Sequence, residues 1–325
     1  MFQRMELPKH VCFKGDNGLY LSARVIQGYN YLQFSSSDMG DPTVRHTIHT
    51  NRDDGTIRIK SDHFGKFWRR SPNWIWADSD DTTDDNLDTV FRAVKFGDVF
   101  ALQNLGNGWY CTRLTTEGKK SCLNASVPSI NKWAHLRLEE AVLSRRIYNV
   151  VYRVMDARIH GQKVQTVATE TAVNRTGTAS AAKLTLKYSV TRRRTWDSSV
   201  SLKLGVATTI QAGVPEVAMS SVKIQEEFSE SYTWGQSVSQ MDEKSVQYDL
   251  PVPAYTKVTL RMMGKQGSCD VPFSYYQEDI LTDGHRVVNK FDDGIYHGVS
   301  SYDFTTEVTE EKLPGPTTDS TCSVL

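Results

Sequence analysis

The strongest constraint on the fold is an alternation of apolar and polar side chains through residues 184–210. A period of two is the period of a β-strand that buries one face. At about 3.3 Å per residue, one such strand would extend on the order of 85 Å, too far for the interior of a compact domain. The pattern therefore predicts an elongated β-sheet module. The apolar set is Leu184, Leu186, Tyr188, Val190, Trp196, Val200, Leu202, Leu204, Val206 and Ile210.

The alternation resumes after Gly213-Val214-Pro215, which predicts a hairpin over about residues 184–234 with its tip at residues 213–215. One interpretation is a long twisted sheet that packs one face on a core. The other is a hairpin that lines a transmembrane β-barrel, for which strands of about 9–11 residues with one apolar and one polar face are long enough. In that case the membrane-inserting residues are Val200, Leu202, Leu204, Val206, Ile210, Val214, Pro215, Val217, Val222 and Ile224.

Charged residues on the apolar face suggest a register for the two arms of an inserted hairpin. If Val200 lies opposite Ile224, apolar residues face one another along the arms and Arg194 faces Glu230. A shift by one residue would set apolar side chains against polar ones. In the soluble form we expect the arms to pack against the module, because arms of this length would otherwise expose a large apolar surface to water. The charged exceptions are Arg192, Arg194, Glu226 and Glu230.

Three repeats open the chain at intervals of about 45 residues. Each contains a strand of alternating pattern, a polar turn with glycine, an aromatic strand and a short closing strand. Phe13, Ile59 and Leu102 occupy the equivalent place in the three first strands. Three units of about four strands that share one core predict a β-trefoil over residues 1–141. A β-sandwich with coincidental spacing is the alternative.

Composition and motifs argue against several classes of function. The 325 residues include 38 basic and 38 acidic side chains, so we expect no general attraction to nucleic acid. We find no phosphate-binding glycine loop, nucleophile motif or metal-ligand motif, and we expect no enzyme activity, no cofactor and no metal. We find neither a transmembrane helix nor a secretory signal. The five cysteines are an odd number and form no CxxC pair. Without a secretory signal we expect them to be reduced thiols, so the sequence predicts a cytoplasmic or nucleocytoplasmic protein.

The end of the chain, residues 313–325, is predicted to be a flexible tail because a Pro-Gly-Pro sequence disfavours regular structure. It closes with Cys322-Ser323-Val324-Leu325, which fits a prenylation box on Cys322. The serine is an imperfect aliphatic position in that box. A single lipid would attach the chain to a membrane only weakly.

Both halves resemble known families. The first resembles the agglutinin domain of amaranthin-like plant lectins, above all in Ser71-Pro72-Asn73-Trp74-Ile75-Trp76 and also in Tyr31-Leu32-Gln33-Phe34-Ser35. Residues 142–312 resemble the aerolysin-type pore-forming module, notably in Ala212-Gly213-Val214-Pro215-Glu216-Val217 and Tyr232-Thr233-Trp234-Gly235. The resemblances imply an all-β chain in which an N-terminal β-trefoil precedes an elongated aerolysin-like antiparallel β-sheet module.

The lectin resemblance implies a ligand of the galactose or N-acetylgalactosamine type, with the T-antigen disaccharide as the favoured candidate. Sugars stack on aromatic rings while a few polar groups orient their hydroxyls. The alternative is that the motif's two tryptophans are trefoil core aromatics, the role we expect for Trp68 and Trp109. In that family the sugar sits between two such domains, whereas this chain has one. Here a second subunit would have to complete the site, or the site is weaker or different. The implied site residues are Ser71, Asn73, Trp74 and Trp76.

Together the resemblances imply a lectin that targets a pore-forming module in plant defence or stress response. The implied partners are glycans or glycoconjugates, further copies of the chain in a homo-oligomer, and a membrane after oligomerisation. A dimer in solution is one form such an oligomer could take. The competing hypothesis is a glycan-binding protein whose second domain only mediates oligomerisation or storage.

Overall fold

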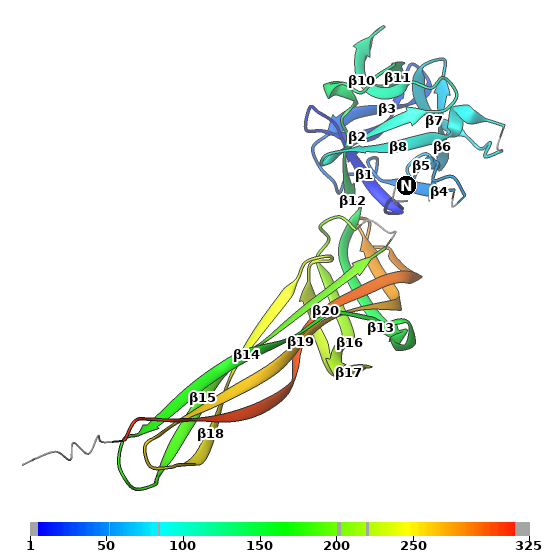
Figure 1. The fold of residues 1–325 in the computed structure, drawn as a ribbon. Helices are drawn as coiled ribbons and strands as arrows, with labels where there is room; N and C mark the ends of the chain where they lie inside the picture. Colours follow the sequence, from blue (N-terminus) through cyan, green and yellow to red (C-terminus); the bar gives the residue numbers. More distant parts are fainter. Residues whose placement is uncertain (1–5, 52, 84, 200–202, 219–220, 316–325) are drawn as a thin grey trace, which may run out of the picture.

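The computed structural model describes residues 6–51, 53–83, 85–199, 203–218 and 221–315. Over these residues the regular elements are β-strands, in two sheets, and three short 3₁₀ helices. Figure 1 shows a rounded N-terminal domain at one end of a long, narrow module. The predicted all-β fold class is confirmed.

The N-terminal domain contains three repeats of four strands. In each repeat the first and fourth strands join a closed ring, in which β1 pairs with β4 and β12, β5 with β4 and β8, and β9 with β8. A bridge between Phe100 and Leu136 completes the ring. The second and third strands of each repeat form a hairpin. The elements are β1 (His10–Lys14), β2 (Tyr20–Ile26), β3 (Tyr29–Ser36), β4 (His46–Thr50), β5 (Ile57–Ser61), β6 (Lys66–Ser71), β7 (Trp74–Ser79), η1 (Leu87–Thr89), β8 (Phe91–Phe96), β9 (Val99–Asn104), β10 (Tyr110–Thr116), β11 (Lys119–Val127), η2 (Lys132–Ala134) and β12 (Arg137–Glu140).

One core serves all three repeats, as their pattern predicts. Phe13, Ile59 and Leu102 are fully buried and belong to one apolar cluster. Trp68, also fully buried, lies 5.2 Å from Phe13 between ring centres. No single repeat could bury these side chains, because each contributes only part of the cluster. The predicted β-trefoil is confirmed.

The second module is one eight-stranded sheet in the order β17-β16-β13-β19-β20-β15-β18, with β14 paired to β19. All its pairs are antiparallel except β13 with β16, which is parallel. The longest strands, β19 and β20, run the length of the module (Figure 1). The elements are β13 (Val142–Tyr152), η3 (Val154–Asp156), β14 (Arg158–Asn174), β15 (Ser180–Ser198), β16 (Thr208–Ala218), β17 (Ser221–Tyr232), β18 (Val238–Val252), β19 (Thr256–Leu281) and β20 (Arg286–Lys312).

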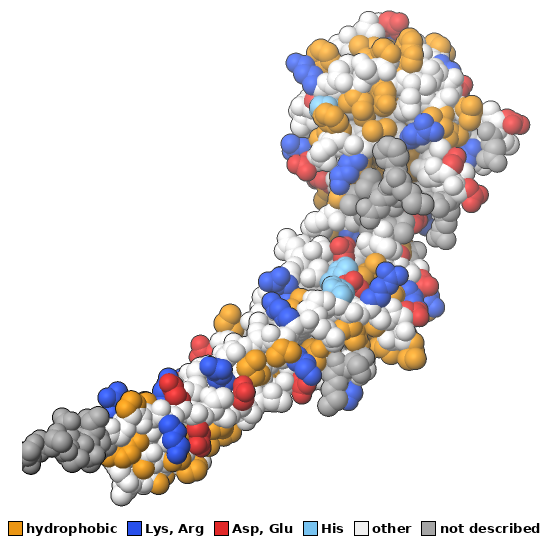
Figure 2. Space-filling model, in the orientation of Figure 1, with side chains coloured by type: hydrophobic (Ala, Val, Ile, Leu, Met, Phe, Trp, Pro, Cys, Tyr) orange, Lys and Arg blue, Asp and Glu red, His pale blue; other side chains and the backbone are white. Residues whose placement is uncertain are grey.

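Two apolar clusters stabilise this module. The one nearer the trefoil is aromatic and includes Trp196, Phe273 and Tyr296. The other lies along the distal strands and includes Leu186 and Leu260. Outside, acidic and basic side chains are intermixed along the face shown in Figure 2, in keeping with equal numbers of the two charges.

The structure corrects the predicted course of residues 184–234. The alternating segment does not form one arm, because β15 ends at Ser198 and β16 begins at Thr208. Gly213-Val214-Pro215 is not a hairpin tip but lies within β16, and the chain reverses between Ala218 and Ser221. Pro215 fits there because the ladder shifts register between residues 213 and 215, and such irregularities tolerate proline.

The predicted pairing of the arms is also absent from this form. Arg194 lies opposite Val238 of β18, and Glu230 lies opposite Ile210 of β16. Residues 200–202, which include the predicted membrane-inserting Val200 and Leu202, lie outside the described residues, as does Cys322. Leu204 packs against the trefoil core rather than extending a strand.

The expectation that the arms fold against the module is confirmed for β16 and β17. Ile210, Val214, Val217 and Phe228 are buried in the aromatic cluster. Ile224 is the exception, with 45% of its surface exposed. The apolar face of this hairpin is therefore largely removed from water by the body of the module.

The arginines on the apolar face have a role that the alternation did not reveal. Arg192 Nε lies 3.2 Å from Glu216 Oε1, and Arg194 lies 3.9 Å from the same oxygen. Arg192 also forms an ion pair with Asp242 at 3.1 Å. Because Glu216 belongs to β16 and the arginines belong to β15, these charges hold the hairpin against the body.

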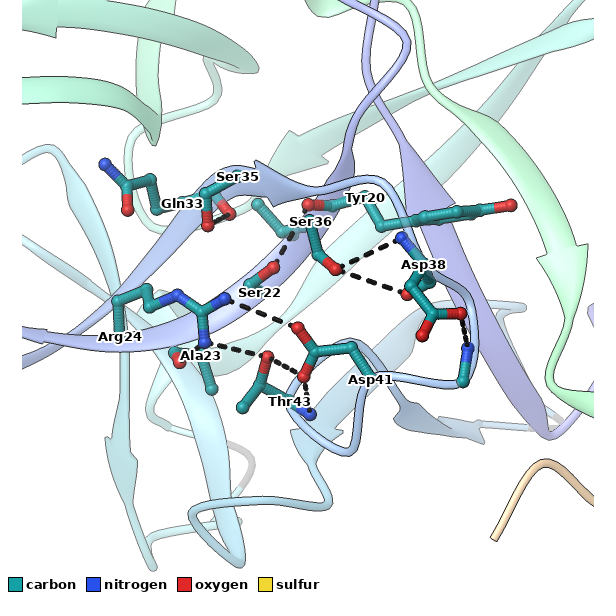
Figure 3. Close-up of polar contacts among 12 residues, drawn as sticks. Tyr20, Ser22, Ala23, Arg24, Gln33, Ser35, Ser36, Asp38, Asp41 and Thr43 are labelled. Atoms are coloured by element: carbon teal, nitrogen blue, oxygen red, sulfur yellow. Dashed lines mark hydrogen bonds and ion pairs between the residues drawn. The ribbon is translucent and has the colours of Figure 1, made fainter.

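A polar network fixes the loop after β3 in the trefoil (Figure 3). Asp41 accepts hydrogen bonds from the hydroxyl and the amide of Thr43 at 2.7 and 2.9 Å, and Arg24 donates to it at 3.4 Å. Burial alone would raise the pKa of Asp41, but Thr43, the Ser36 hydroxyl and Arg24 together lower it to about 2. The ionised carboxylate therefore stabilises this loop.

We expect acid to weaken the trefoil through Asp41. Because its folded-state pKa is depressed, its contribution is present above the unfolded pKa of about 3.9 and is lost as the pH falls towards about 2. Asp41→Asn should cost about 1–2 kcal/mol at pH 7 and flatten the acid decline. Thermal melts from pH 2 to pH 7 measure this, with the exposed Asp53→Asn as control. Equal acid profiles for wild type and Asp41→Asn would contradict it.

Candidate ligand-binding pocket

A pocket of about 370 Å³ lies where the three hairpins of the trefoil meet. These hairpins touch through single pairings of β3 with β7, β3 with β11 and β7 with β11. The pocket is thus built from all three repeats. Its lining residues are Tyr31, Pro72, Asn73, Trp74, Trp76, Leu114, Thr116, Glu117, Lys119, Asn124 and Ser126.

Aromatic rings form one wall of the pocket. Tyr31 makes edge-to-face contacts with Trp74 and Trp76, whose ring centres lie 5.8 and 5.7 Å from its own. Tyr29 stacks on Trp76 at 4.6 Å. Trp74 is only 6% exposed and Trp76 is half-buried, so the rings support one another and present a limited surface to a ligand. Both indoles come from alternate positions of β7 and therefore lie on one face of the strand.

Charged and amide groups surround this wall. The indole Nε1 of Trp74 donates to Glu117 at 3.2 Å, and the ammonium of Lys119 donates to the same carboxylate at 3.3 Å. These two contacts, that of Trp74 first, lower the pKa of Glu117. The Lys119 ammonium also lies 5.7 Å from the Trp74 ring centre. A donor and an acceptor are thus fixed side by side at the rim.

Asn124 supplies a polar group of another kind. It lines the pocket, it is 3% exposed, and its Oδ1 has no hydrogen-bond partner among the described residues. A buried acceptor without a partner carries a desolvation cost that a ligand hydroxyl would relieve. Among the lining residues, Asn124 is therefore a candidate for orienting a bound ligand.

The structure brings together three of the four residues singled out from the sequence. Asn73, Trp74 and Trp76 line the pocket, whereas Ser71 lies opposite Trp74 in the β6–β7 ladder and does not. Sequence patterns missed the lining residues from the first and third repeats. Their only signal was the repeat itself, because a trefoil brings its hairpin ends together.

Two expectations about tryptophans have different outcomes. Trp68 is fully buried in the trefoil core, as expected. Trp109 is not a core residue, since it is 42% exposed at the turn before β10. The Asn107 side chain accepts a hydrogen bond from the Trp109 amide at 3.0 Å, so a local turn contact places this residue outside the core.

Other features that could carry chemistry have ordinary structural partners. Residues 78–88 are rich in aspartate, and within them Asp78 pairs with Arg69 at 2.8 Å and Asp88 pairs with Arg70 at 2.6 Å. Within the described ranges, no three His, Cys, Asp or Glu residues are grouped so that they could hold a metal ion. Nor does any helix of that part of the chain have the length and apolar character to cross a membrane.

Comparison with known proteins identifies the domain that carries this pocket. Residues 5–139 match the family model of the Agglutinin domain, so the N-terminal part of the chain is similar to that domain. Natterin-1 of Thalassophryne nattereri is 25% identical over 139 residues, which are 43% of this chain and 39% of the relative. The chain thus matches less than half the length of this curated relative.

Two solved structures are similar to this chain over different shares of its length. The lamprey immune protein has a TM-score of 0.43 and 12% identity, over 93% of this chain and 91% of that one. An aerolysin-like protein of Bombina maxima has a TM-score of 0.36 and 15% identity, over 51% of this chain and 99% of that one.

Proposed function

We propose that the trefoil is a lectin whose sugar site is the pocket at the meeting of its three hairpins. The observation that carries this proposal is the aromatic wall of Trp74 and Trp76 beside the amide oxygen of Asn124, which has no hydrogen-bond partner within the part of the chain that the structure describes. Sugar sites need an apolar ring face and a few fixed polar groups, and this pocket offers both. The match to the Agglutinin domain supports the same function.

The ligand class that we propose is galactose or N-acetylgalactosamine, with the T-antigen disaccharide as the favoured form. The pocket volume is near the lower end of small-ligand sites and suits a short glycan. Lys119 would donate to ring or hydroxyl oxygens, Glu117 would accept from hydroxyls, and Asn124 would accept at the base. All of these groups belong to one domain, so a single chain would supply the site.

A glycan array of the full-length protein tests this proposal. We expect binding to glycans that end in galactose or N-acetylgalactosamine, with competition by the free disaccharide. Binding confined to glucose- or mannose-terminated glycans would refute the ligand class. An absence of binding to any glycan would refute the lectin function of the pocket.

We also propose that the second module forms a membrane pore, into which the hairpin β16–β17 and its flanking segments unfold. This segment alternates in sequence, and its apolar face is held against the body by packing and by the Glu216 ion pairs. Along the chain this segment lies between β15 and β18. These two strands already pair with each other, from Ser180 opposite Val252 to Arg194 opposite Val238. The membrane strands could therefore extend an existing ladder.

Extension of that ladder gives a definite register, which replaces the one expected from sequence alone. Continuing from Arg194 opposite Val238, Leu204 would face Phe228, Ile210 would face Val222, and the turn would fall at residues 215–217. A bilayer requires about 9–11 residues in each strand, so the span would end near Val206. Glu230 would then lie in the aqueous part of the stem, which removes the cost of a charge in lipid.

The competing function is a glycan-binding protein whose second module only mediates oligomerisation or storage. Glu226 falls on the apolar face at the edge of the proposed span, which favours this alternative. Detergent-resistant rings on glycan-bearing vesicles together with leakage support the pore. Oligomers that form without any leakage support the alternative. In either case we propose a binding protein without catalytic activity.

A further inference from the structure

The connection from β15 to β16 holds a lysine in an aromatic cage. The Nζ of Lys203 lies 5.1 Å from the ring centre of Trp234 and 5.3 Å from that of Tyr275. A third ring, Phe291, lies 4.6 Å away, and Gln277 Oε1 accepts a hydrogen bond from the ammonium at 2.9 Å. Cation–π contacts are strongest when the cation is shielded from water. Lys203 therefore fixes this connection against β19 and β20.

The next residue, Leu204, ties the same connection to the trefoil. Its amide donates a hydrogen bond to Glu140 Oε1 at 2.6 Å, and its side chain packs against the trefoil core. Glu140 is the last residue of β12 and lies opposite Val11 of β1, so it moves with the trefoil. Adjacent residues of one short segment thus contact both domains.

These contacts close into a ring of hydrogen bonds. The amide of Gln277 donates to Asp279 at 2.7 Å, and Arg145 Nε donates to Asp279 at 2.7 Å. Arg145 also donates to Glu140 at 3.2 Å, and Glu140 accepts from the Leu204 amide. Buried networks of this kind are costly when one member leaves, because its partners lose their hydrogen bonds. Glu140 is the only member that the trefoil supplies.

We propose that Lys203 and Leu204 form a latch that holds residues 208–232 folded, and that the trefoil controls this latch through Glu140. The inference rests on the proposed pore function, because the segment that the latch restrains is the proposed membrane hairpin. A displacement of the trefoil would remove the acceptor of the Leu204 amide and expose the leucine side chain. Anchoring of the lectin pocket to a membrane glycan would provide the force for such a displacement.

The burial of the charged Lys203 side chain favours release of the latch once the hydrogen-bond network around Glu140 is broken. Burial lowers the pKa of its ammonium to about 8, so the latched form carries the cost of keeping a charge out of water. In a released hairpin the ammonium regains water and this cost disappears. The latch therefore depends on all the hydrogen bonds of the network, and the loss of one hydrogen bond weakens the others.

Hydrogen exchange in the full-length soluble protein tests the latch without a membrane. Lys203→Ala and Leu204→Ala should each raise exchange within residues 208–232 roughly tenfold, as expected for the loss of one shielded contact. The exposed Lys187→Ala on β15 is the matched control and should leave exchange unchanged. Unchanged exchange of this segment in both latch variants would refute the latch. Exchange in the distal ends of β19 and β20 reports whether a variant has lost the module as a whole.

A test of control by the trefoil needs a variant outside the hydrogen-bond network of the latch. Arg45 of the trefoil forms an ion pair with Asp283 in the turn between β19 and β20, and neither residue is a member of the hydrogen-bonded network that includes Glu140 and Leu204. Asp283→Ala should raise exchange of residues 208–232 if the position of the trefoil sets the latch. If Lys203→Ala raises this exchange and Asp283→Ala does not, trefoil control is refuted. Exchange changes without leakage from any vesicle would refute the pore function and leave the latch intact.

Discussion

Replacement of Trp74 by alanine is expected to lower glycan affinity by about 100-fold or more, the loss typical of a central aromatic anchor. Trp74 links the aromatic wall to Glu117, so its removal deletes a ring surface and disorganises the charged rim. Titration of the favoured disaccharide by calorimetry measures the loss. Asn73→Ala, on the pocket margin, should weaken binding less.

Controls separate binding from folding in this experiment. Trp133→Ala removes an indole that is 45% exposed and outside the pocket, and it should bind as wild type does. Trp74→Phe retains most of the ring packing and loses the hydrogen bond to Glu117, so it should fold and bind with intermediate affinity. Full affinity in a folded Trp74→Ala protein would mean that the sugar binds elsewhere.

A disulfide between the hairpin and the body is expected to abolish pore formation and to spare glycan binding. The Val217 amide of β16 donates to the Ser300 hydroxyl of β20 at 3.2 Å, and both residues are buried. Val217→Cys with Ser300→Cys would tether the segment that must leave. Dye leakage should be absent in the oxidised protein and should return on reduction.

The native thiols should not interfere with this tether. Burial raises the pKa of Cys12 to about 12 and that of Cys122 and Cys269 to about 11, which keeps their thiolate populations low. Cys322 can be replaced by serine in all variants. Val217→Cys alone is the control and should leak under both conditions. Leakage from the oxidised double variant equal to that of the reduced form would show that β16 need not leave the body.

The trefoil could be predicted because its information is repeated three times. Phe13, Ile59 and Leu102 recur at nearly equal spacing with the same local pattern, and only a shared core buries all three. The tip of the hairpin was predicted wrongly at residues 213–215, because glycine and proline there are typical of a turn. Gly213 reads as a turn residue, yet it is glycine within β16, where a side chain would collide with Ile224.

Features that depend on distant partners could not be read from the sequence. Lys203 occupies a polar position of the alternation, and nothing nearby indicates that Tyr275 and Phe291 enclose it. Likewise, Asn124 joins the pocket only because β11 crosses the end of β7. The motif around Trp74 marked one wall of the site, and the fold supplied the others.

Dye release from glycan-bearing vesicles tests most directly the claim that one chain couples glycan recognition to pore formation. Vesicles with and without a glycolipid ending in galactose or N-acetylgalactosamine would be loaded with dyes of graded size. We predict release only from the glycan-bearing vesicles, with one size limit at all protein concentrations, and loss of release with Trp74→Ala. Binding to the glycan-bearing vesicles without release at any concentration would contradict the account.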